Sequence, residues 1–187
     1  MQPTEENIRA AYNAADESGK TLLRNLYPDL SLGQPEKDNR PVTERIKTFE
    51  DACDALGLDA FTEEEGYENL MPDEVAYQKL RLICAALNEG WQPKFTETDV
   101  RWYPWHWLYT QEEIDGMEAD ERADRHMMMT GDYETEYAGF ACAYSRYASS
   151  GTAANVGSRL CLKSETLADY CGKQFISLWA DFKLIRR

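Results

Sequence analysis

Histidine is almost missing from this sequence of 187 residues, which contains only His106 and His126. Metal motifs that need paired histidines or paired cysteines, such as HExxH and the zinc-finger spacings, are therefore not present. The five cysteines are odd in number, are dispersed along the chain, and form no C-x-x-C pair. We interpret them as buried, reduced thiols, as is usual for proteins of a reducing cytoplasm. The sequence thus predicts neither a metal site nor a cofactor.

Long apolar runs are also missing, because no run approaches the ~18 residues that a membrane-spanning helix needs. The opening residues, MQPTEENIRA, have no basic stretch followed by an apolar one. This pattern predicts no secretory signal, no membrane association and a cytoplasmic location.

Basic residues are in the minority, with 20 Lys and Arg against 34 Asp and Glu and a net charge of −14. This balance argues against general nucleic-acid binding and against binding to anionic membranes, since both need excess positive charge. The acids are concentrated in residues 44–74 and 111–137, with 11 and 10 acids respectively. Residues 138–187 contain 7 bases and 3 acids, so this part could present a locally positive surface to a small anion.

The spacing of apolar residues predicts an α+β fold. Residues 1–42 are interpreted as a helical arm and loop, and residues 43–187 as a single domain with an acidic insertion at about 111–137. Apolar residues three and four positions apart predict helices, and alternating ones predict strands. The helices are expected from Thr4, over 20–26, from Thr43 to Gly57, from Pro72 to Gly90 and after Ser164, and the strands over 100–109, 137–145 and 158–163. The prediction is an N-terminal helical half followed by a small antiparallel sheet covered by a C-terminal helix.

Catalytic motifs are incomplete wherever they are suggested. Gly19-Lys20-Thr21 resembles the end of a phosphate-binding P-loop, but the required earlier glycine is replaced by Ala14. Cys142 and His106 could form a nucleophile and its base if their strands pair, although their spacing does not indicate that they do. No catalytic constellation can be named, which favours a binding role over an enzymatic one.

Residues 101–107, RWYPWHW, form an unusually aromatic strand candidate. Alternation places Trp102 and Pro104 on one face and Tyr103, Trp105 and Trp107 on the other. Since one face can fill a small core, some rings could line a pocket that stacks a flat ligand. The alternative is ordinary core and edge packing. The candidate ligand-binding residues here are Arg101, Tyr103, Trp105 and Trp107.

A loop rich in Gly and Ser, residues 149–158, follows the second predicted strand. Small residues allow backbone N–H groups to point at an anion, and Arg159 and Lys163 would supply positive charge. Strand alternation would place both cations on one face. The alternative is an ordinary flexible hairpin loop. The candidate residues of this segment are Ser150, Thr152, Arg159 and Lys163.

Four segments resemble a family of short, largely uncharacterised proteins from phages and mobile elements of gut anaerobes. They are RIKTFEDAC (45–53), ALNEGWQP (86–93), YPW (103–105) and VGSRLCLKSETLADYCGKQFISLWADF (156–182). The resemblance covers most of residues 43–109 and 138–183 and leaves the acidic segment 111–137 unmatched. It implies an intracellular accessory protein and no established activity, so no catalytic residues are carried over.

Two functions of different classes follow from these observations. The first is a non-catalytic protein that binds a small anionic or aromatic ligand, for example by sequestering a nucleotide-like signal of host immunity. The second is a protein-interaction or inhibitor module that uses aromatic residues as an interface and its acidic surface to attract a basic partner. Association of the chain with itself, and an enzyme with an unrecognised site, are further alternatives.

Overall fold

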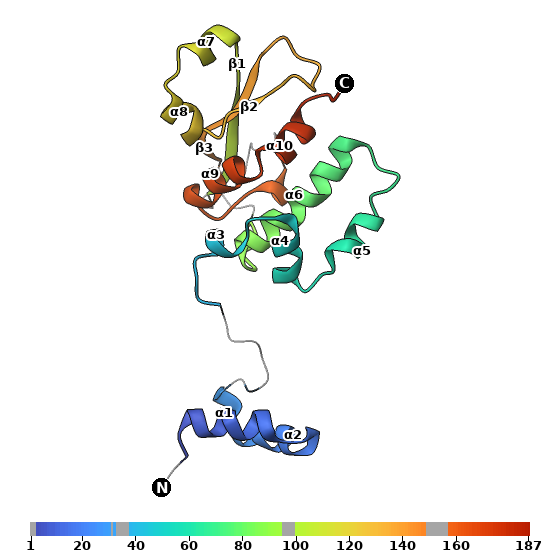
Figure 1. The fold of residues 1–187 in the computed structure, drawn as a ribbon, viewed down its shortest axis with the longest axis vertical. Coiled ribbons are helices and arrows are strands. Elements are labelled where there is room, and N and C mark those ends of the chain that lie inside the picture. The colour runs from blue at the N-terminus through green and yellow to red at the C-terminus, as the bar shows by residue number, and fades with distance from the viewer. Residues whose placement is uncertain (1–2, 31, 33–37, 95–99, 149–156) are drawn as a thin grey trace. The chain divides into compact units, whose positions relative to one another are not determined.

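The computed structural model describes residues 3–30, 32, 38–94, 100–148 and 157–187. It divides into two compact units, Met1–Asn39 and Arg40–Arg187. Together they form an α+β protein with N-terminal helices, a small antiparallel sheet, and C-terminal helices on that sheet (Figure 1). Within the described residues, no helix combines the length and the apolarity that crossing a membrane requires.

The first unit is a pair of helices, α1 (Glu5–Ala14) and α2 (Glu17–Leu26), followed by the short 3₁₀ helix η1 (Pro28–Leu30). Thr4 caps α1 as expected, and Asp16 caps α2, each accepting a hydrogen bond from a backbone N–H. A small apolar core holds this unit together. It consists of Ile8, Tyr12 and Leu32, with Leu23, Tyr27 and Leu30 packed against them.

Four helices form the first half of the second unit: α3 (Val42–Arg45), α4 (Phe49–Leu56), α5 (Ala60–Glu65) and α6 (Pro72–Asn88). The sequence predicted a single helix from Thr43, but α4 begins after Thr48. Thr48 accepts a hydrogen bond from the Asp51 N–H, and the Asp51 carboxylate accepts one from the Thr48 N–H. This reciprocal capping box separates α3 from α4.

Helix α6 is the longest helix and forms the centre of the helical half, where it packs against α4 and α10 (Ile176–Lys183). Pro72 occupies the first turn, where a missing N–H costs nothing. The helix ends at Asn88, and the chain reverses through Glu89 and Gly90, with φ of 49° and 83°. Gly90 adopts this left-handed backbone without the strain of a side chain.

The sheet has three antiparallel strands in the order β1-β3-β2. They are β1 (Arg101–Tyr109), β2 (Met128–Met129) and β3 (Gly139–Ala148). The register between β1 and β3 shifts by one residue after Trp105, which leaves Ala143 of β3 without a partner in β1. Such a bulge bends the pair and increases its twist.

Residues 158–163 are not the third strand that alternation predicted. They form the short 3₁₀ helix η2 (Ser158–Leu160), followed by one isolated bridge between Leu162 and Trp102. Leu160, Cys161 and Leu162 are all buried, whereas a half-covered strand would expose every second residue. The third strand is β2, which comes from the acidic segment.

Two helices, α9 (Glu165–Gln174) and α10, cover the sheet where the sequence predicted one continuous helix. Helix α9 lies directly on β1 and β3. Its close approach needs Gly172, since a Cβ there would lie 2.5 Å from the Cys142 sulfur and 2.7 Å from Cβ of Pro104. The helical path is interrupted at Phe175, whose ring is buried in the core.

The acidic segment 111–137 is part of the fold as well as a connection between two strands. It carries α7 (Gln111–Asp115), α8 (Ala119–Asp124) and β2. Tyr133 is buried in the main core, and its hydroxyl donates to the Asp181 carboxylate at 2.7 Å. The segment therefore stabilises the sheet and the end of α10, which an insertion confined to the surface would not do.

Candidate functional site

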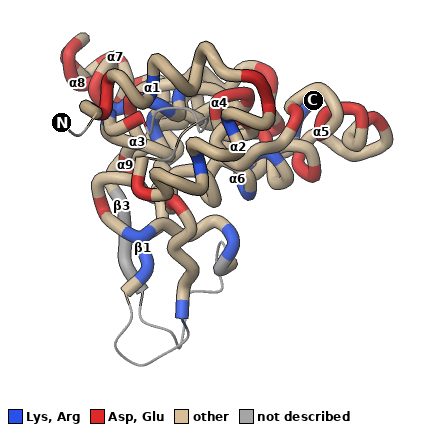
Figure 2. Tube along the Cα trace, turned by 90° about the horizontal axis from the view of Figure 1, so that it is seen from below, with Lys and Arg blue, Asp and Glu red and all other residues tan. Residues whose placement is uncertain are grey.

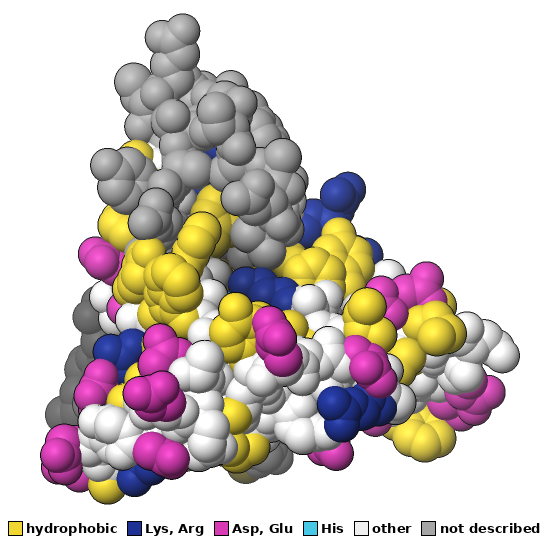
Figure 3. Space-filling model, turned by 90° about the horizontal axis from the view of Figure 1, so that it is seen from above, with side chains coloured by type: hydrophobic (Ala, Val, Ile, Leu, Met, Phe, Trp, Pro, Cys, Tyr) yellow, Lys and Arg dark blue, Asp and Glu magenta, His cyan; other side chains and the backbone are white. Residues whose placement is uncertain are grey.

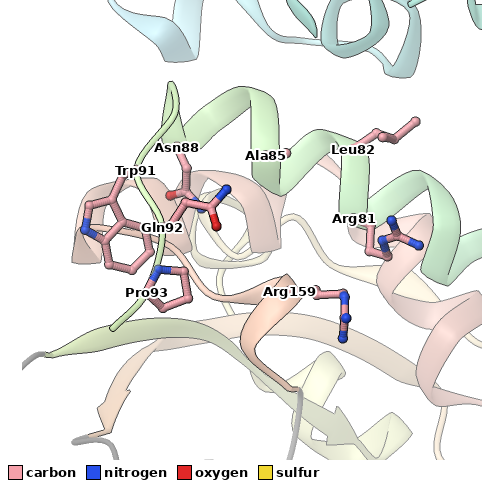
Figure 4. A pocket seen from close by; sticks show the side chains of 8 residues that line it. All are labelled: Arg81, Leu82, Ala85, Asn88, Trp91, Gln92, Pro93 and Arg159. Atoms are coloured by element: carbon pink, nitrogen blue, oxygen red, sulfur yellow. The ribbon is translucent and has the colours of Figure 1, made fainter. Parts of the chain in front are cut away.

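A cleft of about 430 Å³ lies where the C-terminal half of α6 meets residues 91–93 and η2. Among the described residues, its lining contains two guanidinium groups, one indole and two side-chain amides, and no carboxylate. The lining residues are Arg81, Leu82, Ala85, Asn88, Trp91, Gln92, Pro93 and Arg159 (Figure 4).

The wall on the helix side follows from the periodicity of α6. Arg81, Ala85 and Asn88 are three or four residues apart, so they share one side of the helix. Arg81 is half-buried, and its Nη1 donates to Oε1 of Gln78 at 2.9 Å. This bond uses one of the five donors of the guanidinium, and several others are left for a ligand.

Asn88 joins the two walls of the cleft. Its Nδ2 donates to the carbonyl oxygen of Cys161 at 2.9 Å, and its Oδ1 accepts from the Lys163 N–H at 3.0 Å. Asn88 is buried, where an amide without partners would be costly. These two bonds hold the residues after η2 against the end of α6.

Arg159 belongs to η2 and is one of the residues that line the cleft beside α6. It is exposed, and no described residue forms an ion pair with its side chain. Figure 4 shows Arg81 and Arg159 at one end of the cleft, with Trp91, Gln92 and Pro93 toward the other. The cleft therefore has a cationic end and an aromatic end.

Basic residues gather near β1 in this acidic protein. Figure 2 shows Lys and Arg around β1, whereas Asp and Glu are concentrated along α5, α7 and α8. Separation of this kind lets a protein of net charge −14 attract an anion locally.

Of the predicted ligand-binding residues that the structure describes, only Arg159 lines this cleft. Arg101 and Tyr103, which were expected to line a pocket, are instead buried, with 1% and 6% of their surfaces exposed. Arg101 Nη1 donates to the Lys94 carbonyl at 3.3 Å. Burial raises the pKa of the Tyr103 hydroxyl. Both residues contribute to packing around the start of β1.

The remaining predicted residues are dispersed. Trp105 stacks on Tyr144 with ring centroids 6.2 Å apart, and Trp107 is 49% exposed and lines a different cavity. Lys163 was expected to share a face with Arg159, but that expectation required a strand, and residues 158–160 form the helix η2. The amine of Lys163 instead pairs with the Glu89 carboxylate at 3.0 Å. Ser150 and Thr152 lie outside the described residues.

Sequence reasoning missed Arg81, Asn88 and Trp91. They belong to the helical half of the chain, whereas we expected the site within the sheet half. The segment ALNEGWQP did indicate a helix end, since Asn, Gly and Pro there oppose helix continuation. Only the tertiary contact of Asn88 with residues 161–163 reveals that this end forms a cleft.

The structure does pair the strands of His106 and Cys142, which are direct partners in the sheet. The Cys142 thiol is fully buried, and burial raises its pKa to about 12. A thiol in this state is not an effective nucleophile at neutral pH. The other four cysteines are also free and buried, as predicted. Among the described residues, no group of His, Cys, Asp and Glu is arranged to hold a metal ion.

Comparison of the chain with protein-family models, with curated proteins and with solved structures gave no match. The resemblance to phage and mobile-element proteins therefore remains a prediction, and the functional interpretation rests on the geometry of the cleft.

Proposed function

We propose that this protein binds a small anionic ligand with a flat aromatic part in the cleft between α6 and η2, without catalysing a reaction. One observation carries the proposal: Arg81 and Arg159 both line a cleft that also contains Trp91, and none of its described lining residues carries a carboxylate. A nucleotide-like molecule has the matching chemistry, an anionic phosphate at one end and a flat base at the other.

The physical properties of the lining support this ligand class. Guanidinium groups present several N–H donors in a plane and can bind phosphate or carboxylate oxygens in pairs. An indole offers a face on which a base can stack. A volume of about 430 Å³ is within the usual range for small-molecule sites.

A binding role also agrees with the chemistry that the fold provides. Sequestering a ligand needs charge, stacking and hydrogen-bond donors, but neither a nucleophile nor a general base. If the resemblance to phage proteins holds, sequestration of a host signal of nucleotide type would be a suitable biological role.

Arg159→Ala should weaken nucleotide binding with little effect on stability. We expect a loss of about 1.5–3 kcal/mol in binding free energy, the usual contribution of a hydrogen bond to a charged group. The free energy of unfolding should stay within about 0.5 kcal/mol of the wild type, because Arg159 is exposed. The contact between α6 and residues 161–163 is made by Asn88 and does not depend on Arg159. Binding would be measured by calorimetry, with the nucleotide chosen by a thermal-shift screen of nucleoside monophosphates and cyclic nucleotides.

Arg187→Ala is the matched control, because it removes a guanidinium that is 56% exposed and lies outside the cleft. Adenosine and inorganic phosphate, tested separately, should each bind more weakly than AMP. The proposal would be refuted if no nucleotide in the panel raised the melting temperature. Equal loss of affinity in the Arg159 and Arg187 variants would show a general charge effect.

A protein partner is the second candidate, and exposed apolar side chains favour it. Trp107, Met129, Tyr137 and Ile185 are between 38% and 74% exposed. Trp107 and Met129 belong to the sheet, Tyr137 lies just before β3, and Ile185 belongs to the C-terminal residues that pair with the acidic segment. Figure 3 shows hydrophobic side chains gathered beside basic ones on one face. The molar mass of the purified protein in solution would show whether this surface binds a second copy of the chain.

A further inference from the structure

A second cavity, also of about 430 Å³, lies where β1 meets the end of α10. None of its described lining residues also lines the cleft between α6 and η2. Aromatic rings dominate its walls, and the part of the lining that the structure describes has one amine and no carboxylate. The lining residues are His106, Trp107, Leu108, Tyr137, Phe140, Lys183 and Leu184.

The amine of Lys183 is the chemically distinctive group of this cavity. Its Nζ lies 3.0 Å from Nδ1 of His106 and 5.1 Å from the centre of the Trp179 ring. Lys183 forms no ion pair within the described part of the chain, whereas Lys173, at the end of α9, pairs with Asp124 at 3.3 Å. Lys183 is exposed as a residue and lines the cavity, which is the route by which a reagent would reach its amine.

His106 is fixed in the state that accepts a hydrogen bond from this amine. Its Nε2 lies 3.4 Å from the Gly172 carbonyl oxygen, and its ring stacks on Phe140 with centroids 4.8 Å apart. The Nε2–H therefore donates to the carbonyl, and Nδ1 accepts from Lys183. Burial and the nearby Lys183 lower the pKa of His106 to about 3, so the imidazole is neutral at physiological pH.

The surroundings of Lys183 increase the fraction of neutral amine, compared with a lysine in water. Burial of the amine against these rings lowers the pKa of Lys183 to about 8. The groups that face it are the His106 imidazole from β1 and the buried thiol of Cys142 from β3. Asp181, on the same helix, accepts from Tyr133 and pairs with Arg186 at 3.2 Å. The Cys142 thiol and the face of the Trp179 ring act in the opposite direction and favour the cation.

We propose that Lys183 is the reactive amine of a site that binds aromatic carbonyl compounds and condenses with them. The amine nitrogen attacks the carbonyl carbon, and a C–N bond forms as the carbonyl oxygen takes up a proton. Loss of water then gives the C=N bond of a Schiff base, and the two N–H protons of the amine leave with the oxygen. The step needs no oxidant or reductant. Trp107, Tyr137 and Phe140 would hold the aromatic part of the compound.

Reductive trapping tests this site on the full-length protein. The protein would be incubated with benzaldehyde and cyanoborohydride, and the modified lysines identified by peptide mass spectrometry. A pKa of about 8 gives roughly 200-fold more neutral amine at pH 7 than an ordinary lysine has. We expect Lys183 to be labelled about 10-fold faster than Lys173, because a less basic amine is also less nucleophilic. The rate should rise as the pH passes through 8.

Three variants distinguish the contribution of the Lys183 amine from that of the aromatic pocket. Lys183→Arg keeps the positive charge and should lose the fast labelling, whereas Lys173→Arg should retain it. Trp107→Ala should reduce the preference of Lys183 for benzaldehyde over acetaldehyde, because it removes an aromatic wall. Labelling of Lys183 no faster than of Lys173, or only near pH 10, would overturn the proposal by showing an ordinary ammonium held on the Trp179 ring.

Discussion

Replacing Trp179 with alanine should lower the free energy of unfolding by about 3–5 kcal/mol, the usual cost of removing a large aromatic side chain from a core. Trp179 is fully buried, and its indole N–H donates to the Cys171 carbonyl at 3.2 Å. Its ring contacts those of His106 and Phe182. The substitution would leave a cavity between α9, α10 and the sheet, since close-packed interiors collapse only partly.

Trp107→Ala is the matched control, because Trp107 is a tryptophan of the same protein that is 49% exposed. We expect that substitution to cost less than about 1 kcal/mol. Urea unfolding, followed by circular dichroism, would measure both variants. Similar losses for the two tryptophans would contradict the packing of α10 against the sheet.

Asn88→Ala should reduce stability and nucleotide binding together. The substitution leaves the Cys161 carbonyl and the Lys163 N–H without their partner, which should cost about 2–4 kcal/mol in total. Because the same bonds hold the residues after η2 against α6, Arg159 should lose its position in the cleft. We therefore expect a loss of affinity in the variant at temperatures where it is still folded.

Gln111→Ala provides the control for Asn88→Ala, since Gln111 is an exposed amide whose side chain bonds Asp115 at 2.8 Å. That variant should change stability by about 0.5 kcal/mol or less. Thermal unfolding and calorimetric titration would be measured on both proteins. Full affinity in a folded Asn88 variant would show that these two bonds do not position the site.

Local signals in the sequence predicted the fold class and the starts of α1, α6 and α9. Thr4 and Pro72 begin helices where their chemistry predicts, and the aromatic segment from Arg101 is a strand. The errors occurred where two local signals competed. The sequence contains two threonines that could cap this helix, Thr43 and Thr48. Thr48 begins α4, because Asp51 completes a reciprocal cap with it.

The candidate site was much harder to predict than the fold. Arg159 was identified from its charge and its position after a Gly-rich loop. Arg81 and Trp91 are separated from it by more than 60 positions in the sequence, and local pattern does not indicate that they meet. The contact depends on Asn88, whose role as a buried link is visible only once α6 and residues 161–163 are placed together.

Photolabelling with 8-azido-AMP, followed by mapping of the modified peptides, tests the location of the ligand site most directly. Trypsin cuts after Arg81 and Lys94 and releases residues 82–94, which contain Asn88, Trp91 and four other residues of the cleft lining. We predict that this peptide takes up most of the label, and that excess AMP or the Arg159→Ala substitution reduces the labelling. Labelling that falls on other peptides, or that excess AMP does not displace, would contradict the assignment of the cleft as the binding site.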